Sequence, residues 1–245
     1  MTNKSNGDRV ALVTGANKGI GLEIARQLGK QKITILIGAR DERHGHEAAN
    51  RLRDEGIDAH FVRLDVTDQM TIEAAAAQVE REFGKLDILV NNAGIFIEDT
   101  PPSQLDMGVL RRTYDTNFFG AFAVLKVMLP LLKKSEAGRV VNMSSGLGSL
   151  AQTGDPDYEF AEVNALAYNS SKTALNALTV QFANELRGTP IKINSADPGY
   201  VATDMNSHAG YRTVEQGAMV AVRLATLPAD GPTGGFFDEN GALPW

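Results

Sequence analysis

Cysteine is absent from the 245-residue chain. This absence excludes disulfide bonds, thiolate metal sites and thiol nucleophiles, and it fits a reducing compartment. Histidine is almost as rare, with 4 residues. His44 and His46 would diverge on a helix and have no further ligands beside them, so we expect no metal site. Lys and Arg number 24 against 30 Asp and Glu, and no basic tract follows a phosphate backbone, so we expect no nucleic-acid partner.

Long hydrophobic runs are also missing. Residues 1–9 are polar and contain no apolar core of a secretory signal. The most apolar long stretch, residues 121–132, is interrupted by Lys126 and Pro130 and is too short to span a bilayer. We therefore expect no membrane segment and a cytoplasmic protein. The composition is that of an ordinary globular chain, and the length suits one larger α/β domain, residues 1–245, better than two small ones.

Short apolar runs alternate with helix-like segments along the chain. We expect strands at residues 10–14, 32–38, 59–64, 86–90, 138–145, 191–196 and 234–237. We expect helices after each of the first strands, with Ser103 as the cap of a helix that includes Asn117. This alternation predicts right-handed parallel crossovers, and therefore a single doubly wound α/β domain with a mostly parallel seven-stranded sheet and helices on both faces.

A glycine-rich loop follows the first expected strand and reads Gly15-Ala16-Asn17-Lys18-Gly19-Ile20-Gly21. Strand, glycine loop and helix in this order can bind the pyrophosphate of a dinucleotide. Glycine permits the tight turn and the close backbone approach, and the helix N-terminus presents its N–H groups to the phosphates. The spacing departs from the common G-x-G-x-x-G pattern, so a purely structural turn is the alternative.

The second expected strand ends in Ala39-Arg40-Asp41. NAD-binding domains usually place an acid here for the ribose hydroxyls, whereas a basic residue accommodates the 2′-phosphate of NADP. Arg40, together with Lys18 and with Arg43 one turn later, favours NADP(H), by ~100-fold or more if two charge-assisted contacts form. Asp41 suits the start of the next helix, although it would weaken this preference if it turned toward the ribose.

Tyr168-Asn169-Ser170-Ser171-Lys172 places a phenol and an ammonium four residues apart, on one face of a helix. A free tyrosine has a pKa of about 10. A neighbouring cation favours the phenolate, so Lys172 would make the Tyr168 proton available for acid–base chemistry. The motif alone is common on exposed helices.

Polar groups also end the third to sixth strands, where open α/β sheets bind ligands: Asp65-Val66, Asn91-Asn92-Ala93-Gly94, Ser144-Ser145 and Asp197-Pro198-Gly199.

Together these motifs resemble the short-chain dehydrogenase/reductase family over residues 9–240. The matching stretches occur in the family's order: Thr14-Gly15-x-x-x-Gly19-x-Gly21, Asn91-Asn92-Ala93-Gly94, Asn117, a serine after the fifth strand, Tyr168-x-x-x-Lys172 and Pro198-Gly199. The resemblance implies a Rossmann fold with NADP(H) as cofactor. It implies cofactor contacts from Gly15, Asn17, Lys18, Gly19, Ile20, Gly21, Arg40, Asp65, Val66, Asn91, Ala93, Gly94, Tyr168, Lys172, Pro198, Gly199, Val201 and Thr203.

The resemblance also implies the catalytic roles. Tyr168 is expected to protonate the carbonyl oxygen, and Ser145 to hydrogen-bond that oxygen. Lys172 is expected to hold the nicotinamide ribose and lower the pKa of Tyr168, while Asn117 anchors a water that relays protons to Lys172. The residues alone do not choose between Ser144 and Ser145; the family's second serine position selects Ser145.

Within the family, Asn17–Gly21 and Gly138–Asn142 most resemble the NADPH-dependent carbonyl reductases, including the monomeric type and its plant menthone and alkaloid relatives. The implied activity is reversible reduction of a small-molecule ketone or aldehyde. An imine, alkene or sugar-derived substrate is the first alternative. A catalytically idle NADPH sensor that binds a protein partner is the second, and the intact catalytic residues argue against it.

One departure from the family is an insert of intermediate length, Asp155–Val163, between the serine and Tyr168. It is longer than in compact members and shorter than in the long-insert carbonyl reductases, where the insert covers the helix that tetramers use. The sequence leaves open a monomer or a homo-oligomer, and we predict a monomer or dimer.

Overall fold

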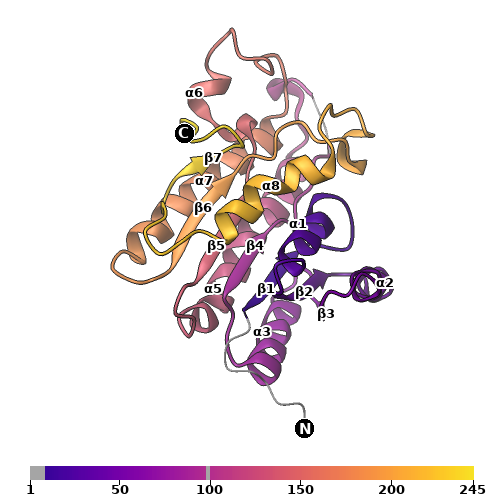
Figure 1. Ribbon diagram of the computed structural model, residues 1–245. Coiled ribbons are helices and arrows are strands. Elements are labelled where there is room, and N and C mark those ends of the chain that lie inside the picture. The colour runs from indigo at the N-terminus through magenta and orange to yellow at the C-terminus, as the bar shows by residue number, and fades with distance from the viewer. Residues whose placement is uncertain (1–8, 98–99) are drawn as a thin grey trace.

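The computed structural model describes residues 9–97 and 100–245. A seven-stranded sheet with the order β3-β2-β1-β4-β5-β6-β7 forms its centre (Figure 1). All six strand pairs are parallel, which confirms the predicted doubly wound fold and makes the sheet entirely parallel. The strands are β1 Val10–Thr14, β2 Thr34–Ala39, β3 Ala59–Arg63, β4 Ile88–Asn91, β5 Arg139–Met143, β6 Lys192–Ala196 and β7 Phe236–Phe237.

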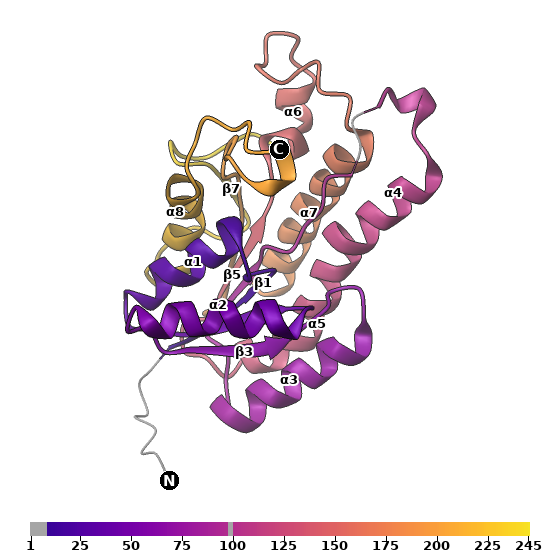
Figure 2. The ribbon, with the colours of Figure 1, turned by 90° about the vertical axis from the view of Figure 1, so that its right-hand side faces the viewer.

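Helices cover both faces of the sheet. The α-helices are α1 Gly19–Gly29, α2 Glu42–Asp54, α3 Gln69–Phe83, α4 Met107–Tyr114, α5 Ala121–Leu132, α6 Leu150–Thr153, α7 Leu166–Glu185 and α8 Val214–Ala225. Three 3₁₀ turns, η1 Pro102–Gln104, η3 Gly146–Gly148 and η4 Asp204–Asn206, and the π-helix η2 Asp115–Gly120 complete the described helical elements. Figure 2 shows α1 and α8 on one side of the sheet and α3, α5 and α7 on the other.

The two helical layers exist because the central strands are apolar on both faces. Ala11 and Val13 of β1 are fully buried and pack into the core under α1, α2 and α8. Leu12, between them, is equally buried but points to the core under α3, α5 and α7. Alternate residues of a strand face opposite sides, so the continuous apolar run of β1 requires a cover on each side.

α4, η2 and α5 form one helical run, Met107–Leu132. We expected Ser103 to cap it; this is wrong, because Ser103 lies in η1 and Asp106 is the cap. The Asp106 carboxylate accepts the N–H groups of Gly108 (2.9 Å) and Val109 (3.1 Å). Aspartate satisfies first-turn amides as well as serine does.

Within the part of the chain that the structure describes, this 26-residue run is the one helix long and apolar enough to cross a membrane. That criterion is length and composition alone. Its residues Val124, Leu125 and Met128 are fully buried in the core with the sheet, as in a core helix.

A row of buried polar side chains crosses the sheet below the site. The Asn91 amide donates to Asn142 Oδ1 (2.9 Å), and the Asn142 amide donates to Thr179 Oγ1 (2.8 Å). The hydroxyls of Thr179 and Ser195 share a further 2.8 Å hydrogen bond. The row links β4, β5, α7 and β6, and pairing offsets the cost of burying these polar groups.

Candidate active site

Tyr168 and Lys172 lie near the start of α7, four residues apart as predicted. Lys172 Nζ is 5.4 Å from the centre of the Tyr168 ring. The Lys172 side chain is buried, and its Nζ donates a 2.8 Å hydrogen bond to the Met143 carbonyl at the end of β5. Phe96, in the loop after β4, packs edge-on against Tyr168 with ring centres 5.2 Å apart. The phenol and ammonium are therefore held by β5, α7 and the β4 loop together.

The pKa values of this pair move in opposite directions. Burial raises the pKa of Tyr168 to about 12, the Asp197 carboxylate adds to the rise, and the Ser145 hydroxyl opposes it. Burial lowers the pKa of Lys172 to about 8. In the protein alone burial is the largest cause of the raised Tyr168 pKa, and Lys172 is not among the causes of the shift, so the expected lowering by Lys172 is not seen there. At neutral pH the phenol keeps its proton, and most Lys172 side chains remain charged.

The two serines after β5 differ in their surroundings. Ser144 is buried, and its hydroxyl has no hydrogen-bond partner among the described residues. Ser145 is partly exposed, faces the Tyr168 phenol closely enough to affect its pKa, and caps η3 by accepting the Leu147 N–H at 3.2 Å. The geometry therefore pairs Ser145, and not Ser144, with Tyr168.

Asn117 lies in the π-helix η2, an element often found at functional sites. Its Oδ1 accepts the Ile95 N–H (2.8 Å), and its Nδ2 donates to the Ile95 carbonyl (3.0 Å) and to Ser171 Oγ (3.0 Å). A side chain on Gly94 would meet Asn117 Oδ1 and Lys172 Nζ, each 3.4 Å from its Cβ position. Asn117 thus ties the loop after β4 to α7 beside Lys172.

The glycine loop is shaped for a phosphate. Gly15 and Gly19 have φ values of 63° and 57°, which other residues adopt at a cost, and a Cβ on Gly21 would collide with the Asn92 amide. Lys18 stands at the N-cap of α1 without a capping side chain, and the first turn carries no acidic residue. The first-turn N–H groups are therefore available to an anion, and the loop fits a dinucleotide pyrophosphate.

Thr14 is a supporting residue whose role the sequence did not predict. Its hydroxyl accepts the N–H groups of Asn92 and Ala93, both at 3.0 Å. The Asn92 side chain returns a 2.9 Å hydrogen bond to the Thr14 carbonyl and another of 3.3 Å to the Gly15 carbonyl. These contacts fasten the corner after β4, which includes Gly94, to the glycine loop. The signal for this role in the sequence is the threonine that directly precedes the first glycine of the loop, Thr14-Gly15.

Arg40 follows β2 and is exposed, and its guanidinium has no hydrogen bond or ion pair with any residue in the described ranges. Asp41 is the N-cap of α2, where its carboxylate accepts the His44 N–H at 2.8 Å, which confirms the capping prediction. That hydrogen bond is the main cause of a lowered Asp41 pKa. Lys18 stands in the glycine loop, as predicted, and its Nζ is 2.6 Å from Asp204 Oδ2; its contact with the cofactor stays a prediction.

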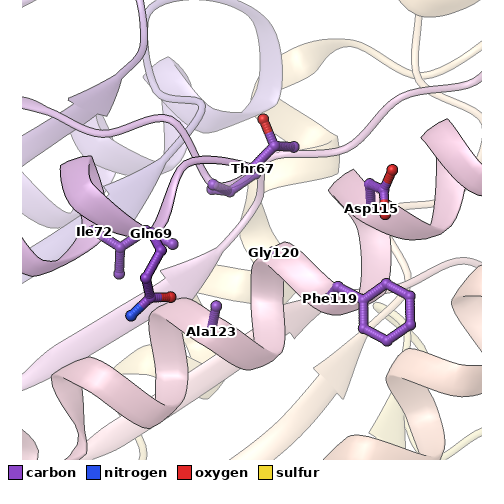
Figure 3. A pocket seen from close by; sticks show the side chains of 8 residues that line it. Thr67, Gln69, Ile72, Asp115, Phe119, Gly120 and Ala123 are labelled. Carbon is purple, nitrogen blue, oxygen red and sulfur yellow. The ribbon is translucent and has the colours of Figure 1, made fainter.

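Asp65 and Val66 follow β3 at the start of the turn into α3. One Asp65 oxygen accepts the Thr67 N–H (2.9 Å) and hydroxyl (2.7 Å), which leaves the other oxygen for a ligand. Figure 3 shows a pocket beside this turn, about 360 Å³ in volume, lined by Val66, Thr67, Gln69, Ile72, Asp115, Phe119, Gly120 and Ala123. It shares Val66 with the expected adenine contacts and includes none of the predicted catalytic residues.

The loop after β6 carries the remaining expected cofactor residues. Gly199 has a φ of 71° and donates its N–H to Asp197 (2.9 Å), which follows Ala196 and precedes Pro198. The Thr203 methyl group lies 4.0 Å from the position of a Cβ on Gly19, so this loop lies next to the glycine loop. The buried Val201 side chain packs against Gly217 of α8.

The Asp155–Val163 insert packs on the same loop through a row of aromatic rings. Tyr158 contacts Phe160, Phe160 contacts Tyr200, and Tyr200 contacts Tyr211, with ring centres 5.7, 5.7 and 5.9 Å apart. The Tyr158 hydroxyl and Asp197 both approach Gly146, next to Ser145. The insert therefore lies against the loop after β6 and against Gly146, next to Ser145.

The short chain dehydrogenase family matches residues 9–212 of the chain. The protein belongs to this family. It is an oxidoreductase with a seven-stranded Rossmann fold, and the match confirms the resemblance seen in its motifs.

Individual relatives are similar over nearly their whole lengths. Salutaridine reductase of Papaver somniferum is 35% identical, with 94% of each chain covered. Carbonyl reductase [NADPH] 1 of Rattus norvegicus is 35% identical over 96% of this chain and 98% of its own. The structure of NADPH-bound carbonyl reductase from chicken fatty liver has a TM-score of 0.85 at 29% identity, over 97% of this chain and 99% of the other. These relatives support a nicotinamide cofactor.

Proposed function

We propose that this protein uses NADPH to reduce a ketone or aldehyde to an alcohol, with Tyr168 as the proton donor. The observation that carries the proposal is the meeting of Tyr168, Ser145 and Lys172 beside a glycine loop that fits a pyrophosphate. The printed activities of relatives such as carbonyl reductase [NADPH] 1 support the same reaction class.

When bound, the cofactor supplies a hydride from its nicotinamide. The chain's own residues then handle the carbonyl oxygen. The Ser145 hydroxyl donates a hydrogen bond to that oxygen, and Tyr168 donates a proton to it as negative charge develops. The raised pKa of Tyr168, about 12, keeps the phenol protonated and ready to donate across the neutral range.

Lys172 has two further tasks in this proposal. Its Nζ donates one N–H group to the Met143 carbonyl. The remaining N–H groups are available to the ribose hydroxyls next to the nicotinamide. Its charge, 5.4 Å from the Tyr168 ring centre, stabilises the phenolate left after proton transfer. Asn117 holds the Ile95 backbone and Ser171 of α7 together beside Lys172. A water relay from Asn117 is part of the proposal.

The preference for NADPH over NADH is assigned to the end of β2. Ala39 is buried there and Arg40 is exposed, so no acid competes with a 2′-phosphate at the position where NAD enzymes place one. The Asp41 carboxylate caps α2 and does not turn toward the ribose in this proposal, so it does not weaken the preference for NADPH.

We propose a cytoplasmic location, which the absence of cysteine fits. We also propose a monomer or dimer, because the Asp155–Val163 insert is intermediate in length between those of compact members and of the long-insert carbonyl reductases. Multi-angle light scattering checks this, and a tight tetramer contradicts it.

The test of function follows the loss of reduced-nicotinamide absorbance near about 340 nm with ketones, aldehydes, imines and alkenes as separate panels. We expect turnover with carbonyl compounds, and turnover at least ~100-fold lower in Tyr168→Phe. Turnover with imines or alkenes alone reassigns the substrate class. NADPH binding without turnover on any panel favours the sensor.

A further inference from the structure

The segment of residues 242–245 runs from β7 toward the turn that follows Ser145, beside α6 (Figure 1). Leu243 donates its N–H group to the Phe236 carbonyl of β7 at 2.8 Å. The Trp245 ring stacks on the Phe236 ring, with ring centres 5.7 Å apart and an angle of 13° between the planes. The strand therefore holds this segment both through its backbone and through an aromatic side chain.

The same segment is bonded to Ser149 and to the start of α6. Ser149 is fully buried. Its hydroxyl donates to the Pro244 carbonyl at 2.9 Å and accepts the Gln152 N–H at 3.1 Å. The Trp245 carbonyl accepts the Ala151 N–H at 2.9 Å. Two consecutive carbonyl groups of the 242–245 segment thus fix the position of Ser149 and of the helix that it caps.

Ser149 is linked to Ser145 through the 3₁₀ turn η3. The Ser149 N–H donates to the Gly146 carbonyl at 3.0 Å, and the Gly148 N–H donates to the Ser145 carbonyl at 2.8 Å. The Ser145 hydroxyl oxygen accepts the Leu147 N–H at 3.2 Å. A serine hydroxyl has a single proton to donate, and the Leu147 contact does not use it. The orientation of η3 therefore decides toward which oxygen the Ser145 proton points.

The helix α7 contacts η3 as well. The Gly148 carbonyl accepts the Thr173 hydroxyl at 3.0 Å and the Asn176 amide at 3.3 Å. A Cβ on Gly148 would lie 2.7 Å from the Lys172 Cβ, so the turn packs directly on α7 beside the predicted catalytic lysine. Contacts with α7 and with the 242–245 segment together hold the turn that carries the Ser145 hydroxyl.

We propose that Ser149 and Trp245 are positioning residues that orient the Ser145 hydroxyl toward the carbonyl oxygen through η3. Trp245 stacks on Phe236 and so keeps the 242–245 segment where the Ser149 hydroxyl can bond to it. Both residues act through Ser145 and not by touching substrate or cofactor. This role rests on the proposed function of Ser145 in carbonyl reduction, so the hold on η3 is also measured without turnover.

The kinetic test uses the carbonyl compound that the parent reduces fastest. Trp245→Ala and Ser149→Ala should each lower kcat roughly 10-fold, because a small displacement of a group at the reacting oxygen is costly, and should leave NADPH affinity unchanged. Trp245→Phe keeps an aromatic ring for the stack and should retain most of the parent's kcat. Leu150→Ala is the matched control, because Leu150 is exposed and lines a cavity of about 270 Å³ together with Trp245; its kcat should equal that of the parent.

A double-mutant cycle separates positioning from a purely structural role. If Trp245 acts through Ser145, then Trp245→Ala should cause no further loss of kcat in a Ser145→Ala background. Independent effects add as free energies, so a purely structural role predicts that the two losses multiply. The same comparison applies to Ser149→Ala.

Hydrogen exchange measures the hold on η3 in the protein without substrate. Amides in a loosened turn exchange faster, so Trp245→Ala and Ser149→Ala should speed exchange in the peptide that contains Leu147 and Gly148, roughly fivefold or more. Trp245→Phe and Leu150→Ala should leave this exchange unchanged. The readout is mass spectrometry of the folded proteins, with circular dichroism as the check of folding.

Three results overturn the positioning role: unchanged kcat in both alanine variants, losses that multiply in the double variants, or unchanged exchange in η3. Each of them, obtained with a parent that reduces carbonyl compounds, rejects the positioning role alone. A parent that reduces no carbonyl compound rejects the proposed function, and the positioning of Ser145 for that reaction is rejected with it.

Discussion

Lys172 Nζ lies 5.4 Å from the centre of the Tyr168 ring, and yet burial moves both residues toward their uncharged forms. Attraction between an ammonium and a phenolate would favour the charged pair, so desolvation is the stronger effect in the protein alone. Tyr168 is therefore protonated at neutral pH, before it donates its proton. The negative charge it acquires on proton transfer is then the charge that Lys172 is placed to stabilise.

Tyr168→Phe removes the proposed proton donor and little volume. We expect turnover to fall by at least ~100-fold, the lower range for general acid catalysis, while NADPH affinity changes little. Steady-state rates and a binding titration measure the two effects. Near-normal turnover would show that another group protonates the product.

The two serines after β5 provide a matched pair of variants. Ser145→Ala should lower kcat by ~100-fold or more, because it removes a hydrogen bond to the developing oxyanion. Ser144→Ala should leave kcat within about twofold and the free energy of unfolding unchanged or slightly raised, since the buried Ser144 hydroxyl has no described partner to lose. Equal losses in both variants would contradict the assignment of Ser145.

Asp197 should set the pH range of the reverse reaction, alcohol oxidation, in which Tyr168 must be a phenolate. The Asp197 charge raises the pKa of Tyr168, so Asp197→Asn should lower that pKa and move the rising limb of kcat/KM to lower pH. Glu159→Gln is the control, because Glu159 raises the pKa of Tyr158 and Tyr211 but is not a cause of the Tyr168 shift. A limb that stays in place in Asp197→Asn, or moves equally in the control, would refute this role.

Lys172→Met should stabilise the fold while removing activity. A pKa lowered from 10.5 to about 8 means that the folded state disfavours the charged lysine, by roughly 3 kcal/mol below pH 8. Between about pH 8 and 10.5 the unfolded chain binds the extra proton, so the stability of the parent rises with pH.

The hydrogen bond to the Met143 carbonyl is lost in this variant, so we expect a net gain of about 1–3 kcal/mol at pH 7. The gain should shrink toward pH 10.5. Urea unfolding at several pH values measures both. A variant less stable than the parent at pH 7 would show that Lys172 is better solvated or paired than its burial indicates.

Local features of the sequence were sufficient for much of the fold and for the positions of the site residues. The apolar run of β1, the glycines at 15 and 19, and the four-residue spacing of Tyr168 and Lys172 each depend on near neighbours. The competition between Ser103 and Asp106 as cap is also local, but both residue types suit an N-cap, and sequence favoured the wrong one.

Contacts between distant segments were not predictable in this way. Nothing near Lys18 in the sequence indicates that Asp204 neutralises it. Nothing near Tyr168 indicates that Asp197 and burial together move its pKa upward. Both effects depend on where the loop after β6 comes to lie, and that position is a property of the complete fold.

The buried row of polar side chains from Asn91 to Ser195 also fixes the distance between Ser145 and Tyr168, the two residues that contact the reacting oxygen in the proposed mechanism. Asn142 lies on β5, three residues before Ser145, and Thr179 lies on α7, the helix that carries Tyr168. The 2.8 Å hydrogen bond between Asn142 and Thr179 therefore couples the segment that carries the serine to the helix that carries the phenol. Apolar packing tolerates small sliding movements of a helix, but a directional bond between buried amide and hydroxyl groups does not. Precision at the reacting oxygen is thus maintained by groups that never touch the substrate, and damage to that row would appear as a catalytic defect in an intact pocket.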